Sequence, residues 1–269
     1  MTTELREQSS TEAASVFGLE GRTVVVTGAG GLLGSEFCRL LATLGAEVWA
    51  IDLTEPEERD RVTPLALDVT REDELRDARS RIGGVDGLVN SAAIDAKFDA
   101  GAAGRHTVRP EDFPVDLWER SLSVNVTGTF LACRVFGEHM AERGRGSIVN
   151  IGSTYGLVAP DQRLYDAGDG SPPGLKPPDY AVTKAAVIHL TRYLAVYWGG
   201  RGVRVNTLTP GGVRNTQDPG FVSRYATRTP LGRMAERHEI AAPLAFLLSD
   251  ASSYMTGSNL VVDGGWTAW

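Results

Sequence analysis

A tyrosine and a lysine lie four residues apart in the stretch Tyr180-Ala181-Val182-Thr183-Lys184. Chance would rarely produce such a pair, since the chain has seven tyrosines and only three lysines. Positions i and i+4 share one face of a helix, so both side chains can reach one site. An ammonium group beside a phenol favours the phenolate and is expected to lower the tyrosine pKa toward working pH. The pair predicts proton transfer with an alcohol oxygen, and an exposed helix pair is the alternative.

A serine hydroxyl provides a second group for such chemistry. Ser153 follows the apolar run Ser147–Ile151, just past the carboxyl end of a predicted strand. Ligands bind at that edge in open parallel sheets. A hydroxyl there can donate a hydrogen bond to a developing alkoxide, although it could instead cap a turn.

A glycine-rich turn, reading TGAGGLLG over residues 27–34, joins a valine-rich run to a helix-like stretch. Glycines let the backbone approach a pyrophosphate, which free N–H groups at the helix start can bind. Asp52, 24 residues after Gly28, ends the next apolar run, near the spacing of a ribose-binding carboxylate. No Lys or Arg in residues 29–33 or at position 53 offsets its repulsion of a 2′-phosphate. This pattern favours NAD(H) over NADP(H), and the alternatives are a tight structural turn and a strand-end cap.

Seven short runs rich in Val and Ile alternate with helix-like stretches such as Leu33–Leu44 and Ala181–Trp198. Apolar residues fill both faces of these runs, as in parallel strands covered by helices on both sides. We therefore expect an α/β Rossmann-type fold, with a doubly wound parallel sheet of about seven strands and helices on both faces. The runs are Thr23–Thr27, Glu47–Ile51, Pro64–Leu67, Asp86–Asn90, Ser147–Ile151, Val203–Leu208 and Asn259–Val262.

Three segments interrupt this alternation. Residues 1–18 are expected to be a polar N-terminal extension, and residues 19–269 a single dinucleotide-binding catalytic domain. Residues 95–114 form a long polar segment that includes His106. Residues 160–179 contain so many prolines and glycines that neither a helix nor a central strand is expected there. Long loops of this kind in compact domains are usually functional or disordered.

Taken together, these motifs resemble the short-chain dehydrogenase/reductase family from about Leu19 to the end of the chain. Further matches are Asp68-Val69, Asn90-Ser91-Ala92-Ala93, Asn125 within Val124-Asn125-Val126, Pro210-Gly211-Gly212-Val213 and Asp263-Gly264-Gly265. No single motif is specific to the family, but the occurrence of so many of its motifs in the same order is.

The resemblance implies a role for each catalytic residue. Tyr180 would be the general acid/base, and Lys184 would bind the nicotinamide ribose and tune Tyr180. Ser153 would polarise the substrate oxygen, and Asn125 would hold a water relay to Lys184. The cofactor NAD(H) would be bound by Gly28, Gly31, Leu32, Leu33, Asp52, Leu53, Asp68, Val69, Asn90, Ala92, Pro210, Gly211 and Val213, together with Tyr180 and Lys184.

The sequence also departs from the family pattern. Leu32 stands where the family usually has its second glycine, Ala93 where glycine is common, and Asn215 where threonine often contacts the carboxamide. The spacing from Ser153 to Tyr180 is 27 residues, roughly twice the usual one, so residues 160–179 are an insertion at the rim of the site. We expect it to form part of a substrate wall for a hydroxyl-rich or charged substrate, the alternatives being a solvated loop or a subunit contact. Residues 214–233 would be a mobile substrate lid.

The sequence thus predicts an NAD(H)-dependent oxidoreductase that interconverts a secondary alcohol and a ketone. Its substrate would be small and polar, with similarity to bacterial sugar-modifying members suggesting a sugar-like compound or sugar nucleotide. Three alternatives stay open: a reductase of an antibiotic or polyketide-type metabolite, a catalytically idle NAD-sensing or scaffold protein, and an epimerase or dehydratase that retains its cofactor. The last usually needs a larger substrate domain than this chain can hold.

Composition excludes other classes of function. A net charge of −7 and a pI near 5.2 disfavour nucleic-acid binding. Two cysteines, Cys38 and Cys133, cannot build a disulfide framework or a four-cysteine zinc site, and the four histidines lack metal-ligand spacing, so no metal is expected. No signal peptide and no long apolar run is found, so we expect a cytoplasmic protein without a membrane span. By resemblance, the chain would form a homotetramer or a dimer.

Overall fold

A seven-stranded sheet forms the centre of the computed structural model, which describes residues 16–95, 108–166 and 174–269. All strand pairs are parallel, and the strand order is β3-β2-β1-β4-β5-β6-β7. This confirms the predicted α/β Rossmann-type fold. The strands are β1 (Thr23–Thr27), β2 (Glu47–Asp52), β3 (Val62–Ala66), β4 (Gly87–Asn90), β5 (Gly146–Ile151), β6 (Val203–Pro210) and β7 (Asn259–Val262).

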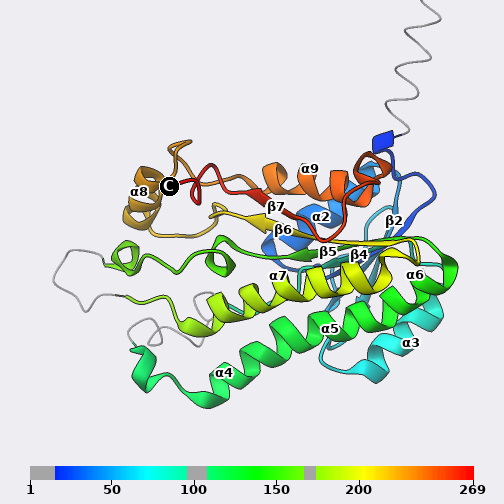
Figure 1. Cartoon of the computed structure of the whole chain (residues 1–269), viewed down its shortest axis with the longest axis horizontal. Helices are drawn as coiled ribbons and strands as arrows, with labels where there is room; N and C mark the ends of the chain where they lie inside the picture. The colour runs from blue at the N-terminus through cyan, green and yellow to red at the C-terminus, as the bar shows by residue number, and fades with distance from the viewer. Residues whose placement is uncertain (1–15, 96–107, 167–173) are drawn as a thin grey trace, which may run out of the picture.

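Helices cover both faces of the sheet (Figure 1). One face carries α2 (Leu32–Thr43) and α9 (Arg237–Leu248), and the other carries α3 (Glu72–Ile82) and α7 (Pro178–Gly199). The same second face carries a long helical run made of α4 (Val115–Leu122), a π-helical turn (Ser123–Gly128), α5 (Thr129–Ala132), a second π-helical turn (Cys133–Gly137) and α6 (Glu138–Arg143). This layering explains why the strands are apolar on both sides.

Alternate residues of the inner strands enter two separate hydrophobic clusters. In β1, Val25 packs in the cluster that contains Phe136 and Trp198, whereas Val24 packs in the cluster that contains Phe37. Both faces of the sheet are therefore buried, and the loops at the strand ends are left to carry function.

Element boundaries differ from the prediction in a few places. Strand β3 begins at Val62 rather than Pro64, and β6 continues to Pro210. The expectation that residues 160–179 hold no helix is wrong at two points: Gln162–Tyr165 forms a 3₁₀ turn, and α7 begins at Pro178. Proline is accommodated at a first helical position because its missing N–H has no partner there in any helix.

Polar residues occupy one row of paired positions across the middle of the sheet. Thr27 pairs with Asn90, Asn90 with Asn150, and Asn150 with Thr207. The Asn90 amide donates to Asn150 Oδ1 at 2.8 Å, and the Asn150 amide donates to Thr191 Oγ1 of α7 at 2.9 Å. The row lies beside the carboxyl ends of the strands, beneath the loops that carry the predicted site.

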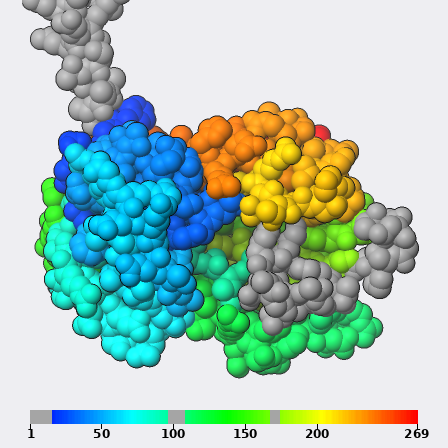
Figure 2. All heavy atoms as spheres, turned by 180° about the vertical axis from the view of Figure 1, so that it is seen from behind, coloured from blue at the N-terminus to red at the C-terminus, as the bar shows by residue number. Residues whose placement is uncertain are grey.

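The predicted site segments gather at that carboxyl edge. Helix α8 (Pro219–Arg228) lies at one end of the molecule in Figure 1, near the C-terminus. In the space-filling view it faces the blue N-terminal half across a hollow, with green atoms deeper between them (Figure 2).

Some predictions fall on residues outside the described ranges. These are residues 1–15 of the N-terminal extension, residues 96–107 of the polar segment, which include His106, and residues 167–173 of the insertion. Within the described ranges, no helix is long and apolar enough to cross a membrane. Nor do three or more His, Cys, Asp or Glu side chains in those ranges gather so that they could hold a metal ion.

Candidate active site

The glycine turn after β1 is shaped by two close backbone contacts. Gly28 has φ +69°, and a Cβ there would lie 2.6 Å from the backbone of Ala92. A Cβ on Gly34 would lie 2.0 Å from the carbonyl oxygen of Gly28. Leu32 is only the first residue of α2, where no glycine is required. The departure from the family pattern at Leu32 therefore leaves the turn intact.

The start of α2 offers free N–H donors to a ligand. Its N-cap residue is Gly31, no side chain caps the helix, and its first turn carries no acidic residue. Unpaired N–H groups and the helix dipole favour an anion at this place. Gly31, Leu32 and Leu33 line the adjoining cavity, so the turn fits the pyrophosphate of a dinucleotide.

Asp52 closes the turn from the second strand. Its carboxylate accepts hydrogen bonds from the N–H of Gly30 at 2.9 Å and from the N–H of Leu53 at 2.7 Å. A cavity of about 1050 Å³ opens here, lined by Asp52, Leu53, Glu55, Asp68, Val69, Ala92 and Arg120 among others. The residues predicted for the adenosine end of the cofactor are thus brought together.

Tyr180, Ser153 and Lys184 meet in a second cavity, of about 450 Å³. Tyr180 lies in the first turn of α7 and forms a side-chain hydrogen bond with Ser153, which follows β5. Lys184 is buried one turn further, with Nζ 5.7 Å from the centroid of the Tyr180 ring. The two cavities share Gly28, Gly31, Ser91 and Ala93, so they form one continuous cleft.

The electrostatics of Tyr180 differ from the expectation. Burial raises the pKa of its phenol, the negative charge of Asp95 raises it further, and the hydrogen bond with Ser153 opposes both. Burial also lowers the pKa of Lys184 to about 8, while Asp95 acts in the opposite direction. Lys184 Nζ donates to the carbonyl oxygen of Ile151 at 2.7 Å. The prediction of a lowered tyrosine pKa is therefore wrong for the protein alone, because burial and the charge of Asp95 outweigh the hydrogen bond with Ser153.

Asn125 ties three segments together. It lies in the first π-helical turn and is buried. Its amide donates to the carbonyl oxygen of Ile94 and to Thr183 Oγ1, both at 3.0 Å, and its Oδ1 accepts from the N–H of Ile94 at 2.8 Å. These contacts fix the loop after β4 against α7 beside Tyr180. The water relay to Lys184 stays a prediction.

Asn90 is not brought to the cleft. Its amide donates to Asn150 Oδ1 and to Cys133 Sγ inside the polar row. Its neighbours Ser91, Ala92 and Ala93 line the cleft instead. The sequence motif identified the right loop, but the asparagine itself points into the sheet.

The opposite wall of the cleft comes from the loop after β6. Pro210, Gly211 and Val213, which were predicted to bind the cofactor, line it together with Asn215. The Gly212 N–H donates to the Tyr225 hydroxyl at 2.6 Å. This bond ties the loop to α8 in the predicted lid.

The insertion contributes to the same wall. Tyr165 and Lys176 line the cavity beside Tyr155, and the Tyr155 and Tyr165 hydroxyls are 2.8 Å apart. Lys176 Nζ forms an ion pair with Asp95 and lies 4.3 Å from the centroid of the Tyr180 ring. Neither Asp95 nor Tyr155 was predicted to be a site residue. Their signal was the position of each two residues from a motif, Asp95 after Ala93 and Tyr155 after Ser153.

A small apolar cluster joins the insertion to the lid. It consists of Leu164, Phe221, Tyr225, Met234 and Trp266. Arg228 of α8 also forms an ion pair with Asp161, and Arg224 Nε donates to the carbonyl oxygen of Leu164 at 2.9 Å. The two segments therefore pack as one unit above the cavity.

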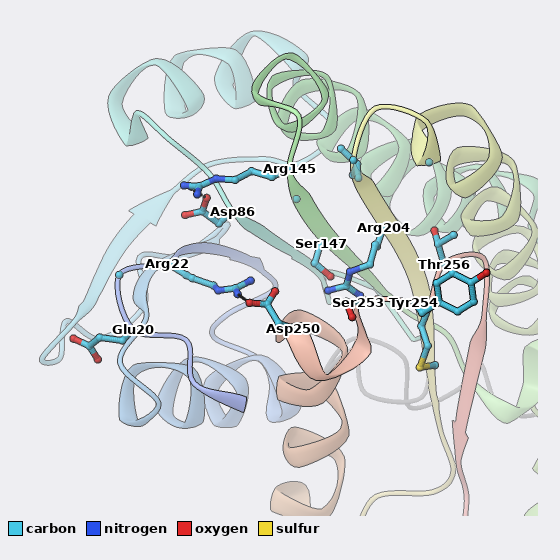
Figure 3. Close-up of a pocket in the computed structure, with 16 residues that line it drawn as sticks. Glu20, Arg22, Asp86, Arg145, Ser147, Arg204, Asp250, Ser253, Tyr254 and Thr256 are labelled. Carbon is cyan, nitrogen blue, oxygen red and sulfur yellow. Dashed lines mark hydrogen bonds and ion pairs between the residues drawn. The ribbon is translucent and has the colours of Figure 1, made fainter. Parts of the chain in front are cut away.

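A different cavity, of about 820 Å³, lies at the amino ends of the strands (Figure 3). Its charged groups already have partners, since Arg22 pairs with Asp250 and Arg145 with Asp86. Arg204 donates to Ser252 Oγ at 2.9 Å and to two backbone carbonyls. None of the predicted site residues lines it, so the cleft at the carboxyl ends is the candidate active site.

Comparison with known proteins agrees with this geometry. A family model described as Enoyl-(Acyl carrier protein) reductase matches residues 11–267. Galactitol 2-dehydrogenase (L-tagatose-forming) of Cereibacter sphaeroides is 37% identical over 273 residues, covering 95% of this chain and 98% of the relative. The chain belongs to the short-chain dehydrogenase/reductase family.

Solved structures of the family show the same architecture. A short-chain dehydrogenase from Leptospira borgpetersenii with bound NAD⁺ has a TM-score of 0.82 and 32% identity, covering 93% of this chain and 94% of that one. A gluconate 5-dehydrogenase from Burkholderia cenocepacia, in complex with NADP and tartrate, has a TM-score of 0.81 and 29% identity, covering 96% and 99%. Short-chain dehydrogenases of this shape thus hold either nicotinamide cofactor.

Proposed function

We propose that this protein is an NAD(H)-dependent dehydrogenase that interconverts a secondary alcohol and a ketone on a small polyhydroxylated substrate. The observation that carries the proposal is the meeting of Tyr180, Ser153 and Lys184 in one cavity that continues into the glycine turn. A protein that only binds the cofactor would not need the two hydroxyls of Ser153 and Tyr180 and the buried amine of Lys184 in this cavity.

The preference for NAD(H) rests on the adenosine end of the cleft. The Asp52 carboxylate points at the Gly30 N–H, where the ribose hydroxyls of a dinucleotide lie when its pyrophosphate is on the turn. Glu55 and Asp68 line the same cavity. A 2′-phosphate would bring further negative charge into a cavity whose described lining holds five carboxylates and one cation, Arg120. Such like-charge contacts disfavour binding.

Bound nicotinamide supplies the hydride acceptor or donor. The Ser153 hydroxyl can donate a hydrogen bond to the substrate oxygen. In alcohol oxidation the Tyr180 phenolate takes the hydroxyl proton as the carbon–hydrogen bond breaks, and in ketone reduction Tyr180 returns it. Lys184, held by the carbonyl oxygen of Ile151, places a positive charge near the phenolate and stabilises it.

The substrate class rests on the polar groups around the reacting end. Tyr155, Tyr165, Asp95 and Lys176 offer donors and acceptors in the cavity wall. Sites that hydrogen-bond a substrate hydroxyl reject analogues that lack it far more strongly than apolar pockets do. The relative named for galactitol, and the structural neighbour named for gluconate, fit such a substrate.

The test is a paired titration of NADH and NADPH by nicotinamide fluorescence, with Asp52→Ala alongside. Tighter NADH binding by the wild type, lost in the variant, supports the cofactor proposal. A panel of polyols and ketoses is then assayed with the preferred cofactor. Equal or tighter NADPH binding would contradict the NAD preference, and absence of turnover across the panel would contradict the substrate class.

A further inference from the structure

We propose that the Asp95–Lys176 pair selects neutral polyols, held by a hydroxyl next to the reacting carbon, over substrates that carry a carboxylate. This inference rests on the proposed function and names the substrate class more closely. It concerns an ion pair between the loop after β4 and the insertion, not the Ser153–Tyr180–Lys184 group.

The pair lies beside the reacting position. Lys176 Nζ is 4.3 Å from the centroid of the Tyr180 ring, and the Tyr180 hydroxyl is hydrogen-bonded to Ser153. A substrate oxygen bound between these two hydroxyls would hold the reacting carbon beside Tyr180 and place the adjacent carbon of the substrate toward the ring face. The hydroxyl on this adjacent carbon is the group that Lys176 and Asp95 would bind.

The pair is also held in place before any substrate arrives. The side chain of Lys176 is only 3% exposed and that of Asp95 17%. The Lys176 N–H donates to Gln162 Oε1 at 2.8 Å, and the Gln162 amide donates to the Lys176 carbonyl oxygen at 3.1 Å. The 3₁₀ turn of the insertion thereby fixes the backbone that carries the ammonium group.

Charge decides which substrates such a pair accepts. A hydroxyl can donate to the carboxylate and accept from the ammonium, which has three N–H donors, so the pair stays together. A substrate carboxylate can only accept, and it would compete with Asp95 for the same ammonium while the two anions repel each other. Among the described residues that line the cavity, Lys184 is the other cation, and it already donates to Ile151. The part of the wall that the structure describes therefore offers a carboxylate no unshared positive charge.

The experiment compares galactitol with galactonate, in which a terminal hydroxymethyl group is replaced by a carboxylate. Each is assayed by kcat/KM with NAD⁺ and by binding to the enzyme–NADH complex, followed by nicotinamide fluorescence. The variants are Asp95→Asn, which leaves the ammonium without its counter-charge, and Lys176→Met, which leaves the carboxylate alone. Asp73→Asn, which breaks an exposed pair with Arg71 on α3, is the matched control.

We expect Asp95→Asn to raise the ratio of kcat/KM for galactonate to kcat/KM for galactitol about tenfold or more. This is the factor that a hydrogen bond to a charged group contributes to binding. Lys176→Met should lower the same ratio, and Asp73→Asn should leave it within twofold of the wild type. NADH binding verifies that each variant is folded, and either variant alone suffices for the test.

A ratio that fails to move in the stated direction, in either variant that still binds NADH, overturns the inference. If galactitol is oxidised but neither variant changes the ratio, this inference fails and the proposed function stands. If binding selectivity shifts as expected while no polyol or ketose is turned over, the selectivity stands and the proposed function fails.

Discussion

At the position of Tyr180, burial and the carboxylate of Asp95 both hold the phenol in its protonated form. Alcohol oxidation needs the phenolate, so the rate of oxidation should rise with pH through the tyrosine pKa. The negative charge of Asp95 raises that pKa, and its removal should therefore lower it.

We predict that Asp95→Asn shifts the pH profile of kcat/KM for alcohol oxidation to lower pH. The reason is the loss of a like charge near the developing phenolate. The profile is measured from pH 6 to 10 with saturating NAD⁺, and Asp73→Asn should leave it unchanged. An unchanged profile, or a shift to higher pH, would contradict the role of the Asp95 charge.

Tyr180→Phe should reduce kcat/KM by about 10²–10⁴-fold, the usual contribution of a positioned acid/base. The phenyl ring keeps the packing, so NADH binding should stay within about threefold of the wild type. Steady-state assays and fluorescence titration measure the two quantities. Tyr254→Phe, at a fully exposed tyrosine, is the control. Unchanged turnover in Tyr180→Phe would show that another group is the acid/base.

At the scale of the element, the glycine turn combines a backbone constraint with a steric one. Gly28→Ala should lower stability by about 1–3 kcal/mol and should also weaken NADH binding, because the new Cβ would collide with the Ala92 backbone that lines the cleft. Gly83→Ala is the matched control, since Gly83 has a similar φ of +74° with nothing within 4 Å. Gly83→Ala should lower the free energy of unfolding and leave NADH binding unchanged. Denaturant unfolding and NADH titration separate the two effects, and equal NADH affinity in both variants would contradict the argument.

Leu164 lies in the apolar cluster that joins the insertion to α8. Leu164→Ala removes a buried side chain, a change that typically costs about 2–5 kcal/mol. The cluster is separate from the two main hydrophobic clusters, so the loss should loosen the lid more than the whole molecule.

Limited proteolysis should then cut residues 214–233 faster in Leu164→Ala, and KM for the substrate should rise. Leu75→Ala, in the main cluster under α3, should lower the melting temperature without raising KM. Equal cutting of the lid in both variants would show that the insertion does not support it.

The sequence was sufficient to predict the seven strands and the residues of the cleft that runs from the glycine turn to Lys184. Both depend on local signals: valine-rich runs that must be buried, and residue types at fixed spacing. The Asp95–Lys176 pair could not be predicted, because its members are 81 residues apart and meet only when the insertion folds back. The orientation of Asn90 was missed for the same reason, since its partner Asn150 lies on the next strand of the sheet.

At the scale of the whole molecule, α7 presents an exposed apolar stripe. Val196 is 87% exposed, Tyr193 65% and Tyr197 61%, and these positions share one face of the helix. Phe130 of α5 is exposed as well. We propose that a second copy of the chain covers this stripe, in keeping with the homo-oligomer expected from the sequence.

Val196→Glu should then shift the protein to a smaller species, because an unpaired charge in an apolar interface costs several kcal/mol. Sedimentation velocity at several concentrations gives the measurement. Tyr254→Glu, at an exposed position outside α7, should keep the wild-type assembly state. A wild type that sediments as a monomer at all concentrations would contradict the proposal.

The polar row through Thr27, Asn90, Asn150 and Thr207 has a consequence for how the chain assembles. In strands that are apolar on both faces, a shift of the pairing register by two residues places similar apolar side chains opposite one another. Apolar side chains alone therefore discriminate weakly between such registers. A slipped β4 or β5 would instead set a buried amide against a valine, with no hydrogen-bond partner, at a cost of about 1–3 kcal/mol per group. The row thus favours the native register of the strands over a slipped one. The native register places the strand ends that carry Ser153 and the cofactor loops side by side.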